Sequence, residues 1–492
     1  MRTLAAQVKV PAYDRGAASI GIVHLGIGAF MRGHLAVATE EALSRGDLRW
    51  GISGVSLRST ETRDALQPQD GMYTVATRTD VNGNNHLSLQ LIGSVVEVLV
   101  APQQTEQVLQ RMTAADTRIV SLTVTEKGYC HDPATGRLLL DNPDIAHDIA
   151  HPEAPRSAIG YIVRALAMRR ALGRAPLTLM SLDNLPSNGH VLSNAVRDLA
   201  AVTDPALAQW IATQCSFPCS MVDRIVPRTT DEEREAISEA LGCVDAWPVV
   251  CEAFFDWAIE DHFASSRPDW SPGGARFVDS AEPWERLKLR MVNGAHSSIS
   301  YLAVLAGWES VDVALRNPEL HRYVESMMRE EIEPTLPVLP GLDLEAYRTQ
   351  LLQRFANTAL NHKTLQIAMD GSQKLPPRLL ETMRDRLHAG LGVRHLALGV
   401  AAWIQYLGGV ADYGTTFPVD DPLCEPLQAL YRGAASDQWS DAAVLRLLSF
   451  SPVFGDLSLQ PSFVTSVQVQ LHALRTGGVL ATLEALNADD AH

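Results

Sequence analysis

The stretch Ile20-Gly-Ile-Val-His-Leu-Gly26-Ile-Gly28-Ala-Phe30-Met-Arg32-Gly-His34 decides the fold of the first half of the chain. Its apolar run, residues 20–25, predicts a strand, and a helical stretch over about residues 34–44 follows. Gly-x-Gly therefore lies at a strand-to-helix turn, where free backbone N–H groups can bind the pyrophosphate of a dinucleotide. The third glycine of the usual fingerprint would fall at Met31, so the fingerprint is incomplete and an ordinary structural turn is the alternative.

The residues around this turn are candidates for binding a cofactor. A second strand is expected at residues 51–57, and the chain just beyond it carries Arg58 and Glu61. A carboxylate there would bind the adenosine ribose of NAD, whereas an arginine there would meet the 2′-phosphate of NADP. We expect NAD and leave NADP open. The predicted cofactor-binding residues are Gly26, Ile27, Gly28, Ala29, Phe30, Arg32, Arg58 and Glu61.

Strand-like and helical stretches alternate through the first half of the chain, which indicates βαβ units and a parallel sheet. Further strands are expected within residues 87–100, 118–124 and 177–182, and helices at 157–172 and 188–201. Beyond about residue 280, segments with helical periodicity dominate, at 283–306, 318–331, 343–356, 377–389, 395–407, 441–449 and 462–475. We therefore expect an α/β Rossmann-like domain with a mostly parallel sheet over residues 1–280, followed by a mainly α-helical domain over 281–492. The segment near residues 366–378 is left open, because it can also pack on the N-terminal domain.

Composition argues against two classes of partner. The chain has 492 residues and a formal net charge of −16, whereas nucleic acids and anionic membranes need clustered basic charge. The N-terminal segment lacks the apolar region of a secretory signal, and the apolar stretch at residues 396–410 is too short to span a membrane. Cys215 and Cys219 have no second pair or close histidine to complete a zinc pattern. We therefore expect a cytoplasmic protein with reduced thiols, no metal and a small-molecule partner.

Lysine is scarce, which is expected of a GC-rich genome. Arginine stays protonated, but a lysine whose pKa is lowered can exchange a proton near neutral pH, so each lysine is a candidate for chemistry. The five lysines are Lys9, Lys127, Lys288, Lys363 and Lys374.

Lys288 belongs to a predicted helix that begins near Pro283. At 100° per residue, Glu285, Asn293 and His296 share one side of this helix with Lys288. A lysine with a lowered pKa can exchange an alcohol proton, an amide N–H can stabilise the alkoxide, and a histidine can hold a neighbouring hydroxyl. The alternative is an amphipathic helix whose polar groups face solvent.

Lys288-x4-Asn293-x2-His296, preceded by Gly-x-Gly-x-Phe-x-Arg-x-His, resembles the polyol-specific long-chain dehydrogenase family, also called the mannitol dehydrogenase family. The resemblance covers about residues 20–480. Four further segments carry it: Ser121-Leu-Thr-Val-Thr-Glu126-Lys127-Gly-Tyr-Cys, Met180-Ser-Leu-Asp183-Asn184-Leu-Pro-Ser-Asn188-Gly189, Phe217-Pro-Cys-Ser-Met-Val-Asp223-Arg224-Ile-Val-Pro227 and Asp370-Gly-Ser-Gln-Lys374-Leu-Pro.

The resemblance implies NAD(P)-dependent, metal-free oxidation of a secondary alcohol in an open-chain sugar derivative by a monomer. By matching positions, it implies that Lys288 is the general acid and base and that Asn184 and Asn293 bind the oxyanion. It further implies substrate contacts or orienting roles for His296, Asp223 and Lys374, and proton-relay or tuning roles for Glu126 and Glu285.

Two segments bear on the substrate. Thr125-Glu-Lys127-Gly-Tyr129 has Lys127 where mannitol-type enzymes of this family usually have glycine, and Gln366 takes the place of the arginine usual in those enzymes. The segment Gln366-Ile-Ala-Met-Asp370-Gly-Ser-Gln-Lys374-Leu-Pro-Pro-Arg378 is similar to the fructuronate reductase, or D-mannonate oxidoreductase, branch. A uronate carries a carboxylate with which Lys127, Lys363 or Arg378 can pair, and an exposed, solvated lysine is the alternative. Against this, Asp245-Ala-Trp-Pro-Val-Val-Cys-Glu252 is more similar to the mannitol dehydrogenases.

We therefore expect reversible reduction of D-fructuronate to D-mannonate. The alternatives are the same chemistry on a neutral sugar, mannitol to fructose or arabinitol to xylulose, and a catalytically silent nucleotide- or sugar-binding regulator.

Overall fold

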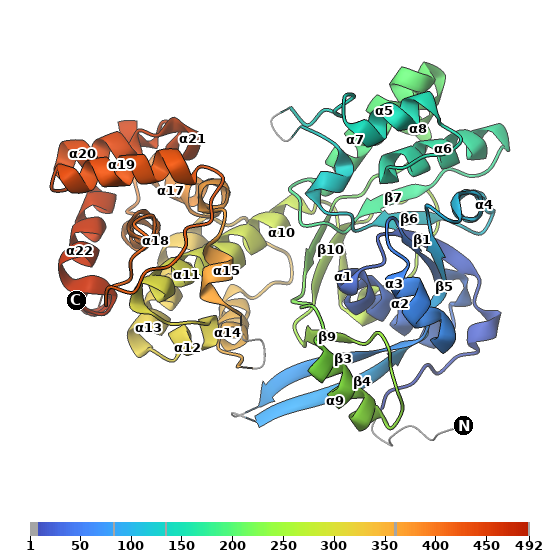
Figure 1. Ribbon diagram of the computed structural model, residues 1–492, viewed down its shortest axis with the longest axis horizontal. Helices are drawn as coiled ribbons and strands as arrows, with labels where there is room; N and C mark the ends of the chain where they lie inside the picture. The colour runs from blue at the N-terminus through green and yellow to red at the C-terminus, as the bar shows by residue number, and fades with distance from the viewer. Residues whose placement is uncertain (1–7, 82–83, 133–134, 359–361, 491–492) are drawn as a thin grey trace. The chain divides into compact units, whose positions relative to one another are not determined.

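The computed structural model describes residues 8–81, 84–132, 135–358 and 362–490 (Figure 1). Its internal contacts divide the chain into two compact units, Met1–Glu282 and Pro283–His492. Residues 366–378 belong to the second of these units.

A five-stranded, all-parallel sheet forms the centre of the N-terminal unit and confirms the predicted Rossmann-like fold. The strand order is β5-β2-β1-β6-β7. From β1 the chain adds β2 and β5 on one side and then β6 and β7 on the other, so the strand order reverses at β1. The strands are β1 (Ile20–Leu25), β2 (Gly51–Ser56), β5 (Val95–Val100), β6 (Ile119–Leu122) and β7 (Thr178–Ser181).

Both faces of this sheet are covered, which explains why β1 is apolar apart from His24. Val23 and Leu25 belong to one buried cluster and Ile22 to another on the opposite face. The first cluster includes residues of α4 (Thr105–Thr113), α5 (Pro143–Ala150), α6 (Ala158–Ala171), α7 (Asn188–Thr203) and α8 (Pro205–Gln214). The second includes residues of α1 (Ala29–Gly33), α2 (Leu35–Ser44) and α3 (Glu61–Leu66).

Two three-stranded sheets complete the N-terminal unit, together with α9 (Asp231–Leu241). Most of their strands were not expected, because four of them have only four or five residues and show too little alternation to stand out in a sequence. One sheet has the order β11-β10-β8, with β11 (Ala275–Val278), β10 (Asp256–Glu260) and β8 (Ser220–Asp223). The other has the order β4-β3-β9, with β4 (Asn84–Ile92), β3 (Tyr73–Val81) and β9 (Val249–Glu252).

The C-terminal unit is helical: within residues 283–358 and 362–490 no strand is assigned. Its central helix, α18 (Arg394–Tyr406), is buried along most of its length and packs against α11 (Ala295–Ala306) and α22 (Pro461–Asp489) (Figure 1). The other helices are α10 (Glu282–Leu287), α12 (Val311–Leu315), α13 (Pro318–Ser326), α14 (Leu344–Phe355), α15 (Thr364–Ala368), α16 (Gly371–Leu375), α17 (Glu381–His388), α19 (Cys424–Ser436), α20 (Asp441–Leu448) and α21 (Ser451–Phe454).

Among the described residues of the C-terminal unit, three segments are π-helical: η6 (Lys288–Gly294), η7 (Met327–Ile332) and η9 (Pro376–Leu380). Such segments, with i→i+5 hydrogen bonding, are rare and often lie at functional sites. The first of them begins at the lysine that the sequence motif singles out.

No helix in the described part of the chain combines the length and the apolar character that crossing a membrane requires.

Candidate active site

A cavity of about 930 Å³ opens at the carboxyl edge of the parallel sheet. Its walls come from the turns after four neighbouring strands: Gly26–Gly28 after β1, 56–59 after β2, 101–102 after β5 and 123–125 after β6. Open α/β sheets bind their ligands at this edge, beside the strand where the order reverses. The size and place of the cavity therefore fit a dinucleotide.

The glycine-rich turn follows from a close approach between two loops. Gly26 has φ +96°, and a Cβ atom there would lie 2.0 Å from the carbonyl oxygen of Thr123. The Thr123 hydroxyl donates to the carbonyl oxygen of Gly26 at 2.7 Å, and the Gly26 N–H donates to Val55 O at 2.8 Å. Only glycine fits this position, which brings backbone to the floor of the cavity.

His24, a residue of β1, contacts Thr123 and so helps to hold this turn. Its Nε2 lies 2.9 Å from the Thr123 hydroxyl oxygen and its Nδ1 lies 2.8 Å from that of Ser121. Complete burial lowers the pKa of His24 to about 3, so the ring is neutral. Because the Thr123 hydroxyl donates to Gly26, Nε2 carries the proton and Nδ1 accepts from Ser121.

Four of the eight predicted cofactor residues line the cavity: Gly26, Ile27, Gly28 and Arg58. The other four predicted residues are not among the described residues that line the cavity: Ala29, Phe30, Arg32 and Glu61. Arg32 instead donates to Trp247 O at 2.6 Å, and burial lowers its pKa to about 10. Glu61 is an exposed residue at the first position of α3.

Several cavity residues were missed because they lie outside any motif. They are Ser59, Thr62, Asn142, Asp144, Arg156 and Tyr161. Arg156 precedes Ser157, whose hydroxyl caps α6 by accepting from Gly160 N at 2.9 Å. The sequence did predict a helix that starts at residue 157, but no sequence pattern indicated that this helix start lies at the cavity.

The loop after β6 carries Glu126 and Lys127, both exposed, in the 3₁₀ turn η4 (Glu126–Tyr129). Lys127 lines the cavity, together with Thr125 and Gly128. Asn184 lies in the next loop along the sheet, three residues beyond the end of β7, and is exposed. These predicted residues of the N-terminal unit thus lie in loops at the same edge of the sheet.

Asp223 ends β8 and is buried. The start of β8 is held by fully buried Asn188, whose amide bonds the Ser220 N–H at 2.9 Å and the Ser220 carbonyl at 2.8 Å. A Cβ atom at Gly189 would lie 2.5 Å from Phe217 O. The Asn188-Gly189 pair in the motif is therefore explained by tight packing between the Asn184 loop and β8.

The helix that carries Lys288 departs from the uniform 100° spacing expected from the sequence. In the π-helix η6, hydrogen bonds join residues five apart, so Lys288 and Asn293 lie one turn apart on the same face. Lys288 and His296 are both buried, which corrects the alternative of a face turned entirely to solvent. Asn293 and Glu285 are partly buried. A lysine this buried is unusual unless it is paired or functional.

Arg378 is a residue of η9 and packs against the end of η6. Its Nη1 donates to the Ser297 hydroxyl at 3.0 Å, and a Cβ atom at Gly294 would lie 2.9 Å from Arg378 O. Burial lowers the pKa of Arg378. In this arrangement the guanidinium is bound in the first turn of α11, directly after the lysine-bearing segment η6.

Gln366 lies within α15, and the remaining predicted cations lie close to it in the chain: Lys363 precedes its first residue and Lys374 belongs to α16. Lys374 donates to Met369 O at 2.7 Å and to Ile367 O at 3.4 Å, and burial, followed by Arg378, lowers its pKa. Lys363 pairs with exposed Glu309 at 3.3 Å, and Gln366 is exposed. Both lysine head groups are thus engaged with the protein itself.

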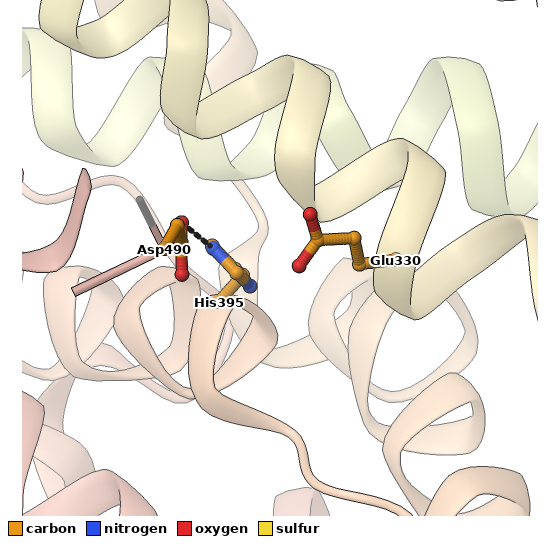
Figure 2. A group of neighbouring side chains, drawn as sticks. All are labelled: Glu330, His395 and Asp490. Carbon is orange, nitrogen blue, oxygen red and sulfur yellow. Dashed lines mark hydrogen bonds and ion pairs between the residues drawn. The ribbon is translucent and has the colours of Figure 1, made fainter. Parts of the chain in front are cut away.

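One group of three potential metal ligands exists among the described residues: Glu330, His395 and Asp490, within 4.8 Å of one another (Figure 2). Both ring nitrogens of His395 are already engaged, Nδ1 with Glu331 at 3.1 Å and Nε2 with Asp490 at 2.9 Å. Glu330 also pairs with Arg329 at 2.7 Å. We assign this group to ion pairing that joins helices of the C-terminal unit.

Comparison with known proteins gives two family matches. The mannitol dehydrogenase Rossmann domain matches residues 20–272 and the mannitol dehydrogenase C-terminal domain matches residues 280–475. D-mannonate oxidoreductase of Escherichia coli K12 is 44% identical over 97% of both chains. Mannitol 2-dehydrogenase of Aspergillus terreus is 37% identical over 97% of this chain and 95% of its own.

Two solved structures are similar over nearly the whole chain. The ternary complex of Pseudomonas fluorescens mannitol 2-dehydrogenase with NAD and D-mannitol has a TM-score of 0.82 at 37% identity, covering 98% of this chain and 97% of that one. A substrate-free D-sorbitol dehydrogenase has a TM-score of 0.91 at 33% identity, covering 98% of both chains.

Proposed function

The chain belongs to the mannitol dehydrogenase family, as its sequence motifs suggested, and is a secondary-alcohol oxidoreductase of the polyol and aldonate class. From this premise we propose that it catalyses the reversible reduction of D-fructuronate to D-mannonate. The observation that carries the proposal is the 44% identity to D-mannonate oxidoreductase across 97% of both chains. The mannitol 2-dehydrogenase of A. terreus is 37% identical over a similar length.

NAD is the coenzyme that fits the cavity. At Gly28, which lines the cavity, a Cβ atom would meet only Gly26 O, at 3.9 Å, so the backbone of the Gly26–Gly28 turn is open to a pyrophosphate. Arg58 lines the cavity and keeps NADP as the alternative. When bound, the nicotinamide supplies the hydride that reduces the ketone.

Residues of the chain then bind the carbonyl oxygen of the ketone and supply its proton. Lys288, which is buried, holds the proton that passes to the carbonyl oxygen. Asn293, one helical turn away, and Asn184 donate amide N–H groups to that oxygen. His296 orients a neighbouring substrate hydroxyl, and Asp223 and Lys374 contact the substrate or orient other groups. Glu126 and Glu285 relay protons or tune the neighbouring groups.

A uronate substrate requires a cation for its carboxylate. Of the predicted candidates, Lys127 is exposed at the cavity, whereas Lys363 pairs with Glu309 and Arg378 bonds Ser297. We therefore rank Lys127 first.

The neutral-sugar alternative rested on the likeness of residues 245–252 to the mannitol dehydrogenases. Asp245 is buried and accepts the N–H groups of Thr74 at 2.6 Å and Trp247 at 3.0 Å. Arg32 bonds the carbonyl of Trp247 in the same turn. This segment braces the fold, so its sequence is a weak guide to substrate.

A parallel assay of NADH oxidation with D-fructuronate, D-tagaturonate, D-fructose and D-xylulose tests the proposal. We expect D-fructuronate to give the highest kcat/KM. Turnover of D-fructose with none of D-fructuronate would support the neutral-sugar alternative. Tight NADH binding without turnover of any ketose would support the silent regulator. Sedimentation would test the monomer implied by the family resemblance.

A further inference from the structure

Thr125 lies at the cavity with an unusual backbone. Its φ of 62° and ψ of 166° fall in a region that essentially only glycine adopts, and threonine is β-branched. Such a conformation persists only where neighbouring groups enforce it, and it is concentrated at functional sites. Because Thr125 and Val124 both line the cavity, whatever enforces this conformation also shapes the cavity.

The carboxylate of Asp183 enforces it. One oxygen, Oδ2, accepts the Val124 N–H at 2.9 Å, and the other, Oδ1, accepts the Thr125 N–H at 2.9 Å. Two consecutive N–H groups are thus held by one side chain from a loop 58 residues further along the chain.

Buried Tyr129 holds this carboxylate in turn. Its hydroxyl donates to Asp183 Oδ2 at 2.7 Å and lies 2.5 Å from the Ser181 hydroxyl oxygen. Burial, followed by the charge of Asp183, raises the pKa of Tyr129 well above its usual value, so the phenol remains a donor. Burial also raises the pKa of Asp183, against which the N–H groups of Val124 and Thr125 and the Tyr129 hydroxyl act.

The main chain of Asp183 is fixed as firmly as its side chain. Its carbonyl oxygen accepts the Leu185 N–H at 2.9 Å and the buried side-chain amide of Asn188 at 3.0 Å. Asn184 lies between these anchored positions. Asp183 therefore joins a wall of the cavity to the backbone that carries Asn184.

We propose that Asp183 is a positioning residue that sets the coenzyme-binding loop at Val124 and Thr125 and, through its own backbone, the amide of Asn184. The inference rests on the proposed function for the role of Asn184, but the effect on the coenzyme loop stands without it. A purely structural Asp183 would stabilise the fold without acting on NADH affinity.

Asp183→Asn tests the carboxylate, because an amide presents one acceptor oxygen where two N–H groups need one each. We expect the Kd for NADH, measured by fluorescence titration without substrate, to rise about tenfold for the loss of one charge-assisted bond. We also expect kcat to fall, because the Asp183 side chain would no longer hold the backbone next to Asn184 against Val124 and Thr125. Tyr129→Phe, which leaves both N–H bonds, is the matched control and should change the Kd less than Asp183→Asn.

Rescue separates positioning from simple stability. Thr125→Gly in the Asp183→Asn background removes the β-branched side chain that the carboxylate must hold in place. We expect the Kd for NADH to return most of the way towards the wild-type value. In the wild-type background, Thr125→Gly should raise the melting temperature, a readout that remains if Asp183→Asn fails to fold.

An unchanged NADH affinity in Asp183→Asn, with only a lower melting temperature, would overturn the proposal. So would a double variant as weak as the single one, or a Thr125→Gly variant less stable than wild type. If no ketose is turned over but the NADH affinities follow the expected pattern, the proposed substrate fails and the role of Asp183 in the coenzyme loop stands.

Discussion

Lys288 carries the proposed chemistry because it is a buried residue of a type that can give up its proton. Lys288→Arg is the sharpest test, since arginine keeps the charge but cannot act as a proton donor near neutral pH. We expect kcat to fall by about 10²–10⁴-fold, the usual contribution of general acid–base catalysis. NADH binding should persist. Near-normal turnover at neutral pH in Lys288→Arg would exclude this role.

Lys127 tests the substrate class. Replacing it by glycine, the residue usual in mannitol-type enzymes, removes a charge-assisted contact of about 1.5–3 kcal/mol, or roughly 10- to 150-fold in kcat/KM. We expect this loss with D-fructuronate and little change with D-fructose. Lys9→Gln, at an exposed lysine that pairs with Glu41, is the control for general charge removal. An equal loss on both ketoses would assign Lys127 to the coenzyme instead.

Gly26 and Gly46 form a natural pair for testing the cavity floor. Their φ angles are +96° and +97°, but a Cβ atom meets Thr123 O at 2.0 Å at Gly26 and nothing within 4 Å at Gly46. Gly46→Ala should cost about 1–2 kcal/mol of stability from backbone strain alone. Gly26→Ala should carry the same strain and also lose NADH binding. Calorimetry and NADH titration on both variants compare them, and equal behaviour would show that the close approach is unimportant.

At the scale of elements, an ion-pair cluster joins three helical segments of the C-terminal unit. His395 at the start of α18 bonds Glu331 in η7 and Asp490 beyond α22. Burial lowers the pKa of His395, but Glu331 and Asp490 outweigh it, and the pKa lies above its usual value. The neighbouring charges are Glu330, paired with Arg329, and Arg394, which bonds Leu486 O and lies 3.5 Å from Asp490.

This cluster makes stability depend on pH. Because the folded pKa of His395 is raised, its stabilisation is complete below the unfolded pKa of about 6.5 and is lost as pH rises through the folded value. We expect the melting temperature to fall over this window in wild type and to fall less in His395→Gln. Exposed His472→Gln should follow wild type. A parallel decline in all three proteins would assign the pH effect elsewhere.

Long, strongly patterned elements were predictable and short or irregular ones were not. The run at residues 20–25 became β1 with the same bounds, because both faces of that strand are buried. The predicted helix over residues 283–306 has a π-helical turn inside it, and periodicity assumes a uniform helix. Residues such as Arg156 reach the cavity only through the folding of distant segments, for which one sequence holds no local signal.

At the scale of the whole molecule, the motif residues are divided between two compact units. Gly26, Asn184 and Asp223 belong to the N-terminal unit, whereas Lys288 and His296 belong to the C-terminal one. Composition argued against nucleic acid as the main partner, and the motifs indicated the family and the reaction type. Neither could choose between a uronate and a neutral ketose, because that choice rests on a few polar contacts.

The most direct test of the central claim is product identification. Wild-type protein is incubated with NADH and D-fructuronate, and the aldonate formed is separated and quantified against the NADH consumed. The account predicts one D-mannonate for each NADH oxidised, with a higher kcat/KM than for D-fructose under the same conditions. NADH oxidation by D-fructose with no D-mannonate formed from D-fructuronate would contradict it.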